Sequence, residues 1–326
     1  MKAVLYTRYG SPDELQMAEV PKPTPKAGEV LVKIHATAIN SADARLLRGK
    51  PFLVRFMGYG LFSPRYRILG CDVAGRVEAV GEGVTAFNVG DAVYGDLSEH
   101  GMGGFAEYVS VSQTALAPTP MPTQLNDEEA AALPLAGVTA LQALKKAQVK
   151  AGERVAINGA SGGVGTLAVQ LAHALGAEVT AIASASKLDM LRELGATHVI
   201  DYAQEDFTAQ AGQYDVILGV NGYHPIANYA RALKDGGRYV MVGGADAQLF
   251  EALLHAPFVS WRTGKHLSSL IAKTTRDDLL ALNEWVARGA LKPVIERRYA
   301  LQDLQEALRT LEMGHARGKL VISLSA

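Results

Sequence analysis

A run of small residues in the middle of the chain has the spacing of a phosphate-binding turn. Residues 160–165 read ASGGVG, a variant of the G-x-G-x-x-G fingerprint in which a small residue allows the tight turn. Gly162 would let the backbone approach a pyrophosphate, and Gly165 would let the following helix pack close to the preceding strand. The free N–H groups and the positive dipole end of that helix would then face the phosphates.

The elements around this turn strengthen the interpretation, because glycine-rich turns before helices are common by themselves. An apolar strand is predicted at 155–158, directly before the turn, and a helix with one apolar face at 164–175, directly after it. A second strand is predicted at 179–184, which is the spacing of a βαβ unit. This context predicts a dinucleotide site.

The end of the second strand indicates which dinucleotide is bound. A cofactor with a free 2′-hydroxyl usually meets an Asp or Glu about 20 residues beyond the glycines. Here Ser184, Ser186 and Lys187 occupy that stretch, and no carboxylate occurs before Asp189. Two hydroxyls and an ammonium suit a 2′-phosphate, so we predict NADPH rather than NADH. The alternative for Lys187 is a solvated lysine at a helix start.

Size and composition limit the class of protein. A chain of 326 residues with 48% hydrophobic and 20% charged residues is typical of two soluble globular domains. A net charge of -1 gives no global field that favours nucleic acid or an anionic membrane. We expect a cytoplasmic protein, because no stretch approaches the ~20 apolar residues of a membrane span.

The pattern of strands and helices divides the chain into three parts. Residues 1–124 read as short strands separated by Gly- and Pro-rich turns, which suggests a small barrel or sandwich. Residues 125–272 alternate strands and helices, as in a doubly wound parallel sheet. Residues 273–326 contain two amphipathic helices, each ended by glycine, and a closing strand. The predicted fold class is therefore α/β, with one β-rich domain.

Several motifs, in order, resemble the zinc-independent quinone oxidoreductase branch of the medium-chain dehydrogenase/reductase superfamily. They are GCDVAGRVEAVGEGVTAFNVGDAVYG, GGFAEYVSV, AAALPLAGVTALQAL, GASGGVGTLAVQLAHALGAEV, LGATHVIDY, ALKDGGRYVMVGG and GHARGKLVI. The resemblance implies a GroES-like catalytic domain built from residues 1–124 and 273–326, and a Rossmann NADP(H)-binding domain at 125–272. It also implies a homodimer, formed through an edge strand near 266–272.

The resemblance also assigns cofactor contacts to positions in this chain. Residues of the glycine loop would contact the pyrophosphate, and three residues would surround the 2′-phosphate. Others would lie after the fourth strand, beside the nicotinamide ribose, and near the nicotinamide ring. The pyrophosphate contacts would be Ser161, Gly162, Gly163 and Val164, and the residues around the 2′-phosphate would be Ser184, Lys187 and Tyr202. Asn221 and Gly222 would lie after the fourth strand, and Val242 and Gly243 would lie beside the nicotinamide ribose. Asn40 and Thr139 would lie near the nicotinamide ring.

The chain departs from zinc-dependent alcohol dehydrogenases at their metal ligands. Those enzymes have Cys at the position of Asn40 and a His-Glu pair at the position of Cys71 and Asp72. Cys71 is the only cysteine, so no structural site with several thiolates can form. Cys71, Asp72 and a distant histidine could supply ligands in principle, but we interpret Cys71 as a small buried residue. We predict no zinc.

The absence of a Lewis acid favours an acceptor that is already electrophilic. We therefore expect hydride transfer from NADPH to a quinone or an α,β-unsaturated carbonyl. Asn40 could hydrogen-bond the substrate carbonyl or the carboxamide of the cofactor, and Tyr59 and Tyr66 are candidate stacking or proton-donor groups. Asp43 is expected to be structural and to pair with Arg45 or Arg48. Two alternatives remain open: an enoyl-thioester reductase and a non-catalytic NADPH-binding sensor.

Overall fold

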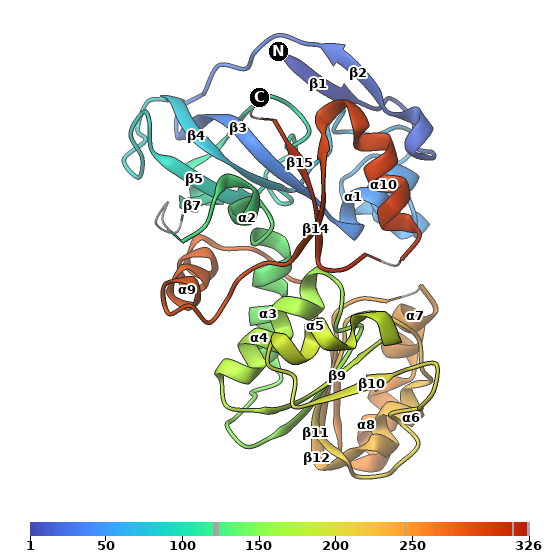
Figure 1. Ribbon diagram of the computed structural model, residues 1–326. Helices are drawn as coiled ribbons and strands as arrows, with labels where there is room; N and C mark the ends of the chain where they lie inside the picture. Colours follow the sequence, from blue (N-terminus) through green and yellow to red (C-terminus); the bar gives the residue numbers. More distant parts are fainter. Residues whose placement is uncertain (120–123, 245, 315, 325–326) are drawn as a thin grey trace. The chain divides into compact units, whose positions relative to one another are not determined.

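The computed structural model describes residues 1–119, 124–244, 246–314 and 316–324 (Figure 1). The chain forms two compact units. The first unit comprises Met1–Val138, Lys273–Arg288 and Pro293–Ala326, and the second comprises Thr139–Ala272 and Gly289–Lys292. The domain boundaries expected after residues 124 and 272 stay a prediction.

The first unit is built on a seven-stranded, mostly antiparallel sheet. Its longest strand, β3 (Glu29–Ile39), pairs along one side with β4 (Asp72–Val80). The other side of β3 is shared, because β6 (Tyr108–Ser112) pairs with its first half and β15 (Lys319–Ser323) with its second half. The remaining strands of this sheet are β5 (Ala92–Asp96), β7 (Leu116–Pro118) and β14 (Ile295–Ala300). A separate hairpin is formed by β1 (Lys2–Leu5) and β2 (Gln16–Glu19).

Alternation along the strands of the first unit gives this sheet two buried faces. Val30, Val32 and Ile34 of β3 lie in one apolar cluster with residues of β4, β5, β6 and β7. The opposite face packs against helices, where Leu47 and Leu308 lie in a second cluster. The helices of this unit are α1 (Ser41–Arg48), α2 (Asp127–Ala131), the start of α3 (Pro134–Lys146), α9 (Arg276–Ala287) and α10 (Leu304–Glu312).

The second unit is a six-stranded parallel sheet with the strand order β10-β9-β8-β11-β12-β13. Counted from β8, this is the doubly wound order 3-2-1-4-5-6, which reverses between β8 and β11. The strands are β8 (Arg154–Asn158), β9 (Glu178–Ala183), β10 (His198–Asp201), β11 (Tyr214–Gly219), β12 (Leu233–Met241) and β13 (His266–Ser269).

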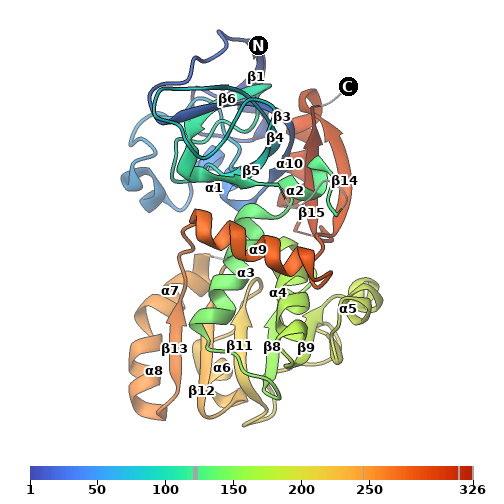
Figure 2. The same cartoon turned by 90° about the vertical axis from the view of Figure 1, so that its left-hand side faces the viewer.

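Helices cover both faces of this parallel sheet (Figures 1 and 2). The helices α4 (Gly163–Ala174) and α5 (Leu188–Glu193) connect β8, β9 and β10 on one side, and the other side carries α6 (Ile226–Ala232), α7 (Asp246–Leu254) and α8 (Ala256–Thr263). The predicted fold class is confirmed. Among the described residues, no helix is both long and apolar enough to span a bilayer.

Two short elements differ from the sequence-based expectation. The sequence predicts short strands and turns throughout residues 1–124, but the stretch after β3 contains α1 and a 3-10 helix at Phe52–Met57. Helix α1 has only eight residues, so its periodicity is too short to stand out from a loop. The Asp43 carboxylate stabilises its start by accepting the Asn40 N–H at 2.8 Å.

Candidate functional site

The glycine turn after β8 is held by contacts that leave no room for side chains. Gly159 has φ +84°, and a Cβ there would lie 2.6 Å from the backbone nitrogen of Asn221. A Cβ at Gly165 would lie 2.3 Å from the Gly159 carbonyl oxygen. The start of α4 therefore lies directly against the turn, as the fingerprint requires.

Gly162 differs from these two glycines because space remains beside it. It is the N-cap of α4, with an extended backbone (φ −80°, ψ 179°) and no side chain to occupy the helix end. A Cβ at Gly162 would have only one neighbour within 4 Å, the Gly159 carbonyl at 3.8 Å. The first N–H groups of α4 have no partners within the helix. This open cradle of N–H donors fits the pyrophosphate of a dinucleotide.

The loops after β11 and β12 join the glycine turn at the same edge of the sheet. The backbone N–H of Asn221 donates to the Asn158 carbonyl at 3.1 Å, so the loop with Asn221 and Gly222 lies against the turn. Val242 and Gly243 follow β12, and both of their N–H groups donate to the Gly219 carbonyl, at 2.9 and 3.2 Å. These residues thus lie where the strand order reverses, the usual ligand-binding edge of such sheets.

The end of β9 brings the three candidates for the 2′-phosphate close together. Ser184 caps the short turn Ala185–Lys187, and its backbone carbonyl accepts the Lys187 N–H at 3.0 Å. The Tyr202 N–H donates to the carbonyl of Ala183, while its side chain is exposed. Lys187 is only 8% exposed, so the alternative of a solvated lysine is wrong. The ring of Tyr202 is 57% exposed and thus accessible to a ligand, whereas Lys187 is buried.

Thr139 and Asn40 do not belong to one compact unit. Thr139 lies half-buried in α3 and belongs to the second unit, and Asn40 belongs to the first. Their joint contact with a nicotinamide ring therefore stays a prediction.

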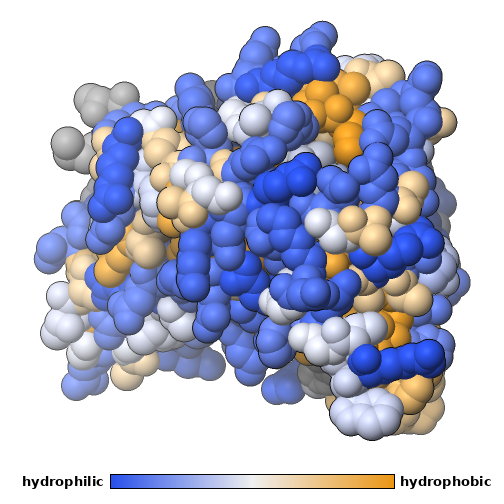
Figure 3. Space-filling view, turned by 90° about the horizontal axis from the view of Figure 1, so that it is seen from below, coloured by the Kyte–Doolittle hydropathy of each residue, from blue (hydrophilic) through white to orange (hydrophobic). Residues whose placement is uncertain are grey.

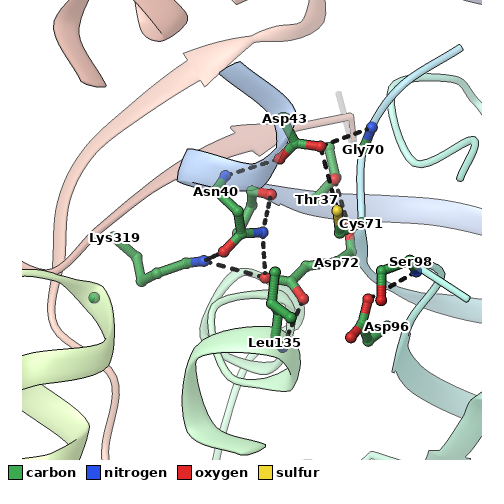
Figure 4. Close-up of polar contacts among 12 residues, drawn as sticks. Thr37, Asn40, Asp43, Gly70, Cys71, Asp72, Asp96, Ser98, Leu135 and Lys319 are labelled. Carbon is green, nitrogen blue, oxygen red and sulfur yellow. Dashed lines mark hydrogen bonds and ion pairs between the residues drawn. The ribbon is translucent and has the colours of Figure 1, made fainter. Parts of the chain in front are cut away.

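Asn40 lies in a buried cluster of polar side chains in the first unit (Figure 4). Its amide oxygen accepts a hydrogen bond from the Lys319 ammonium at 2.6 Å. Its amide nitrogen donates to Asp72 Oδ2 at 2.9 Å and to the Ala38 carbonyl at 3.3 Å. Lys319 also pairs with Asp72 at 3.1 Å, and both side chains are almost fully buried. Both hydrogens of the Asn40 amide are thus committed inside the protein.

Asp72 connects this cluster to two further elements. Its Oδ1 accepts the backbone N–H of Leu135 at 2.8 Å, and its own carbonyl accepts the Thr37 hydroxyl at 2.5 Å. The buried Asp72 carboxylate thus accepts hydrogen bonds from Asn40, Lys319 and Leu135, which compensate for its loss of contact with water.

Asp43 occupies the next layer of the cluster. Its carboxylate accepts the N–H groups of Asn40 and Gly70 and the thiol of Cys71, the last at 3.4 Å. Desolvation, followed by the nearby Asp72 carboxylate, raises the pKa of Asp43 to about 7. These contacts agree with the structural role expected for Asp43. The expected ion pair between Asp43 and Arg48 does not form, because Arg48 pairs with Glu312. Cys71 is fully buried, and burial raises the pKa of its thiol well above the ordinary value.

The two candidate tyrosines lie in the segment between α1 and β4. Tyr59 and Tyr66 are half-buried, with ring centroids 6.1 Å apart in an edge-to-face arrangement. Burial raises the pKa of Tyr59, so its hydroxyl remains a proton donor at neutral pH. Among the described residues, no three His, Cys, Asp or Glu side chains form a group that could hold a metal ion.

Comparisons with known proteins agree with this architecture. The family Alcohol dehydrogenase GroES-like domain matches residues 26–121, and the family Zinc-binding dehydrogenase matches residues 194–322. A 2-methylene-furan-3-one reductase of Solanum lycopersicum is 36% identical, over 99% of this chain and 79% of the relative. The chain belongs to the quinone oxidoreductase-like branch of the medium-chain dehydrogenase/reductase superfamily.

Two further members of the superfamily show the same extent of similarity. The NADPH-dependent alkenal/one oxidoreductase of Arabidopsis thaliana, a chloroplastic protein, is 33% identical over 99% of this chain and 79% of its own length. The solved structure of the quinone oxidoreductase from Coxiella burnetii superposes with a TM-score of 0.87, at 32% identity, with 99% of both chains covered. The resemblance drawn from the motifs is therefore confirmed.

Lys319 is the residue of the buried cluster that sequence reasoning missed. It lies in the terminal motif GHARGKLVI, followed by the apolar residues of β15. A lysine at the start of a buried strand is a signal for a buried partner, because a lysine is rarely buried alone. The partner itself could not be inferred, since Asp72 lies 247 residues away in the sequence.

Two glycines of the turn should respond differently to the same substitution. Gly165→Ala places a methyl group against backbone atoms, so we expect a loss of about 1–3 kcal/mol or more in the free energy of unfolding. Gly162→Ala should fold normally but weaken binding of a nicotinamide dinucleotide by roughly tenfold or more, because the methyl group enters the pyrophosphate space. Urea denaturation measures the loss of stability in Gly165→Ala, and calorimetry measures the loss of dinucleotide affinity in Gly162→Ala. Normal affinity in Gly162→Ala would contradict the assignment of the cradle.

Asp43 should make stability depend on pH. Its pKa is about 7 in the folded protein and near 3.8 in the unfolded chain, so the folded state binds an extra proton between these values. Stability should therefore fall as pH rises from about 4 to 7. Asp43→Asn should flatten this part of the curve, measured by urea denaturation, while the exposed control Asp189→Asn should not. Identical slopes in Asp43→Asn and the unmodified protein would exclude Asp43 as the source.

Proposed function

We propose that the chain is an NADPH-dependent oxidoreductase that reduces quinones or α,β-unsaturated carbonyls without zinc. The observation that carries the proposal is the glycine cradle, together with a serine and a buried lysine where NADH-binding sheets usually place a carboxylate. The relatives named as reductases of a methylene-furanone and of alkenals and enones support the acceptor class.

The second unit would hold the cofactor. The N–H groups of Gly163 and Val164, beside Ser161 and Gly162, would bind the pyrophosphate, and Ser184, Lys187 and Tyr202 would surround the 2′-phosphate. Asn221, Gly222, Val242 and Gly243 line the same sheet edge and would lie toward the nicotinamide half. Bound NADPH would supply a hydride to the acceptor.

The first unit would orient the reacting groups. Because both Asn40 amide hydrogens are committed to Asp72 and Ala38, we assign Asn40 a positioning role rather than direct donation to substrate. Its oxygen is held by the bond from Lys319, which fixes the orientation of the amide beside the proposed nicotinamide position. Tyr59 and Tyr66 would contact the acceptor, and the Tyr59 hydroxyl is the proposed proton donor.

The zinc-independence of the reaction rests on the same cluster. At the position of a zinc-binding cysteine the chain has an amide, and the Asp72 carboxylate is neutralised by the Lys319 ammonium. A divalent cation placed there would have to displace a buried cation, which is unfavourable. The expectations of a cytosolic location and of no nucleic-acid partner stay predictions.

The test is NADPH oxidation, followed by its absorbance, with a panel of quinones and enones, plus metal analysis of the purified chain. Turnover without stoichiometric metal is the expected result. Cofactor binding without turnover on any acceptor would favour the NADPH-binding sensor instead. Turnover restricted to enoyl thioesters would favour the enoyl-thioester reductase.

Lys187 should determine the preference between the two cofactors. Lys187→Met removes a charge-assisted contact with the 2′-phosphate, so NADPH affinity should fall by roughly 10- to 100-fold. The affinity for NADH should change little, and calorimetry with both cofactors measures the ratio. Arg192→Gln, at an exposed position in the adjoining helix α5, is the matched control and should leave the ratio unchanged. An equal loss for both cofactors would indicate a structural role only.

We also propose a homodimer, formed through β13 and the adjoining helices. β13 is the last strand of the sheet, so one side of its backbone is unpaired within the sheet. Beside it, α7 and α8 expose the apolar residues Leu249, Phe250, Leu253, Leu254, Phe258 and Trp261. Figure 3, which views the molecule from below, shows apolar side chains in orange at its lower right. A second copy related by a twofold axis would extend the sheet and cover the apolar residues.

The dimer should depend on this surface. Sedimentation should give twice the chain mass of 34.6 kDa for the unmodified protein. Trp261→Asp introduces a charge at a residue that is 81% exposed, so it should yield monomers without loss of folding. Val89→Asp, which is similarly exposed in the first unit, is the control. A dimer that persists in Trp261→Asp would place the interface elsewhere.

A further inference from the structure

The segment Gly49–Gly70 carries a surface that the proposed reduction does not use. It connects α1 to β4 in the first unit, and only Tyr59 and Tyr66 of this segment enter the proposed site. We name residues 49–70 the aromatic–cationic segment. Its exposed side chains include three phenylalanines, two arginines and a lysine.

All charged side chains in this part of the sequence are positive. Between Asp43 and Asp72 the sequence contains no Asp or Glu, although it contains six cations: Arg45, Arg48, Lys50, Arg55, Arg65 and Arg67. Arg48 is paired with Glu312. Among the described residues, Lys50, Arg55, Arg65 and Arg67 form no ion pair. The chain's net charge of -1 therefore hides a local excess of positive charge.

Three phenylalanines of the segment are exposed. Phe52, Phe56 and Phe62 have exposed fractions of 58%, 63% and 91%. The inward residues Val54, Tyr59, Tyr66 and Ile68 already pack against the apolar cluster beneath the segment. The exposed rings are thus additional to the residues that anchor the segment on this apolar cluster.

The segment holds these rings in a fixed arrangement. The Arg65 N–H donates to the Tyr59 carbonyl at 2.8 Å and closes a turn that has Phe62 near its tip. The Tyr9 hydroxyl hydrogen-bonds the carbonyls of Tyr59 and Gly60, at 3.0 and 2.5 Å.

The Phe52–Phe56 pair is connected to this turn through the same tyrosine. The Arg55 guanidinium stacks over the Tyr9 ring at 4.2 Å and lies 5.3 Å from the Phe52 ring. The Phe52 and Phe56 rings are 5.4 Å apart. Tyr9 therefore contacts both the 3-10 helix and the turn, so the rings of Phe52, Phe56 and Phe62 are held in one part of the surface.

We propose that the aromatic–cationic segment docks on an anionic lipid surface. Exposed phenylalanines would enter the boundary between headgroups and acyl chains, and the flanking cations would bind lipid phosphates. The lipid surface is favoured over an acidic protein because the phenylalanines lie at the tip of a turn and on a short 3-10 helix, where they are exposed to solvent beside cationic side chains. The long cationic side chains can reach headgroups while the rings lie deeper. The proposal does not depend on the reductase activity.

The first experiment is flotation of the full chain with vesicles. We expect binding to phosphatidylcholine vesicles that contain about one-third phosphatidylglycerol, no binding to pure phosphatidylcholine, and loss of binding at high salt. Lys50→Gln combined with Arg67→Gln should lower the partition coefficient by roughly 25-fold, about fivefold per cation. Phe56→Ser combined with Phe62→Ser should lower it by at least about tenfold.

Matched controls separate this surface from the rest of the chain. Arg192→Gln combined with Arg288→Gln removes two exposed cations elsewhere, and Val89→Ser removes an exposed apolar side chain outside both proposed surfaces. These variants should float like the unmodified protein. Melting temperatures and NADPH oxidation with a water-soluble quinone should be unchanged in all variants, because none of these residues belongs to the proposed site.

A label reports directly on insertion. Cys71 is the only cysteine and is fully buried, so Phe62→Cys provides a single reactive thiol for an environment-sensitive dye. Its emission should shift to the blue with anionic vesicles, whereas the dye on Val89→Cys should not respond. Absence of flotation, or flotation unaffected by both double variants, would overturn the proposal. Binding to polyglutamate but not to vesicles would also overturn it, in favour of an acidic protein partner.

Discussion

The first unit depends on one buried cation. The Lys319 ammonium is shared between the Asn40 amide oxygen and the Asp72 carboxylate, and Asp72 also accepts the N–H of Leu135. These contacts join the end of β3, the start of β4, the start of α3 and the last strand of the chain. Without the ammonium, two buried carboxylates, Asp43 and Asp72, would repel each other with no compensating charge.

The two units meet the demands of binding in opposite ways. In the second unit, the proposed cofactor site depends on the absence of side chains, because Gly159 and Gly165 let the backbone pack closely and Gly162 leaves open space. In the first unit, the proposed site contains side chains whose hydrogen bonds are largely used internally, so their orientation is fixed by the protein itself. The open cradle can accept a ligand with little rearrangement, and the buried cluster can position one.

The sequence was informative where a function requires local geometry. The glycine turn, its flanking strand and its helix follow from residues 155–175 alone, because contacts within a βαβ unit are close in sequence. The contacts of Asn40 could not be derived in this way, since its partners come from distant strands. Lys187 illustrates the same limit: its position was predicted, but its burial depends on packing around α5 that no local pattern encodes. The short helix α1 was missed because eight residues carry too little periodicity.

The closing strand β15 has a consequence for synthesis of the chain on the ribosome. β3 is made early, but half of one side must wait for β15, which follows the whole parallel sheet in the sequence. The second unit is nearly continuous in sequence and can finish its parallel sheet before β15 leaves the exit tunnel. We infer that the unit translated first is the last to reach its final state, with an unfinished strand edge exposed in the interval.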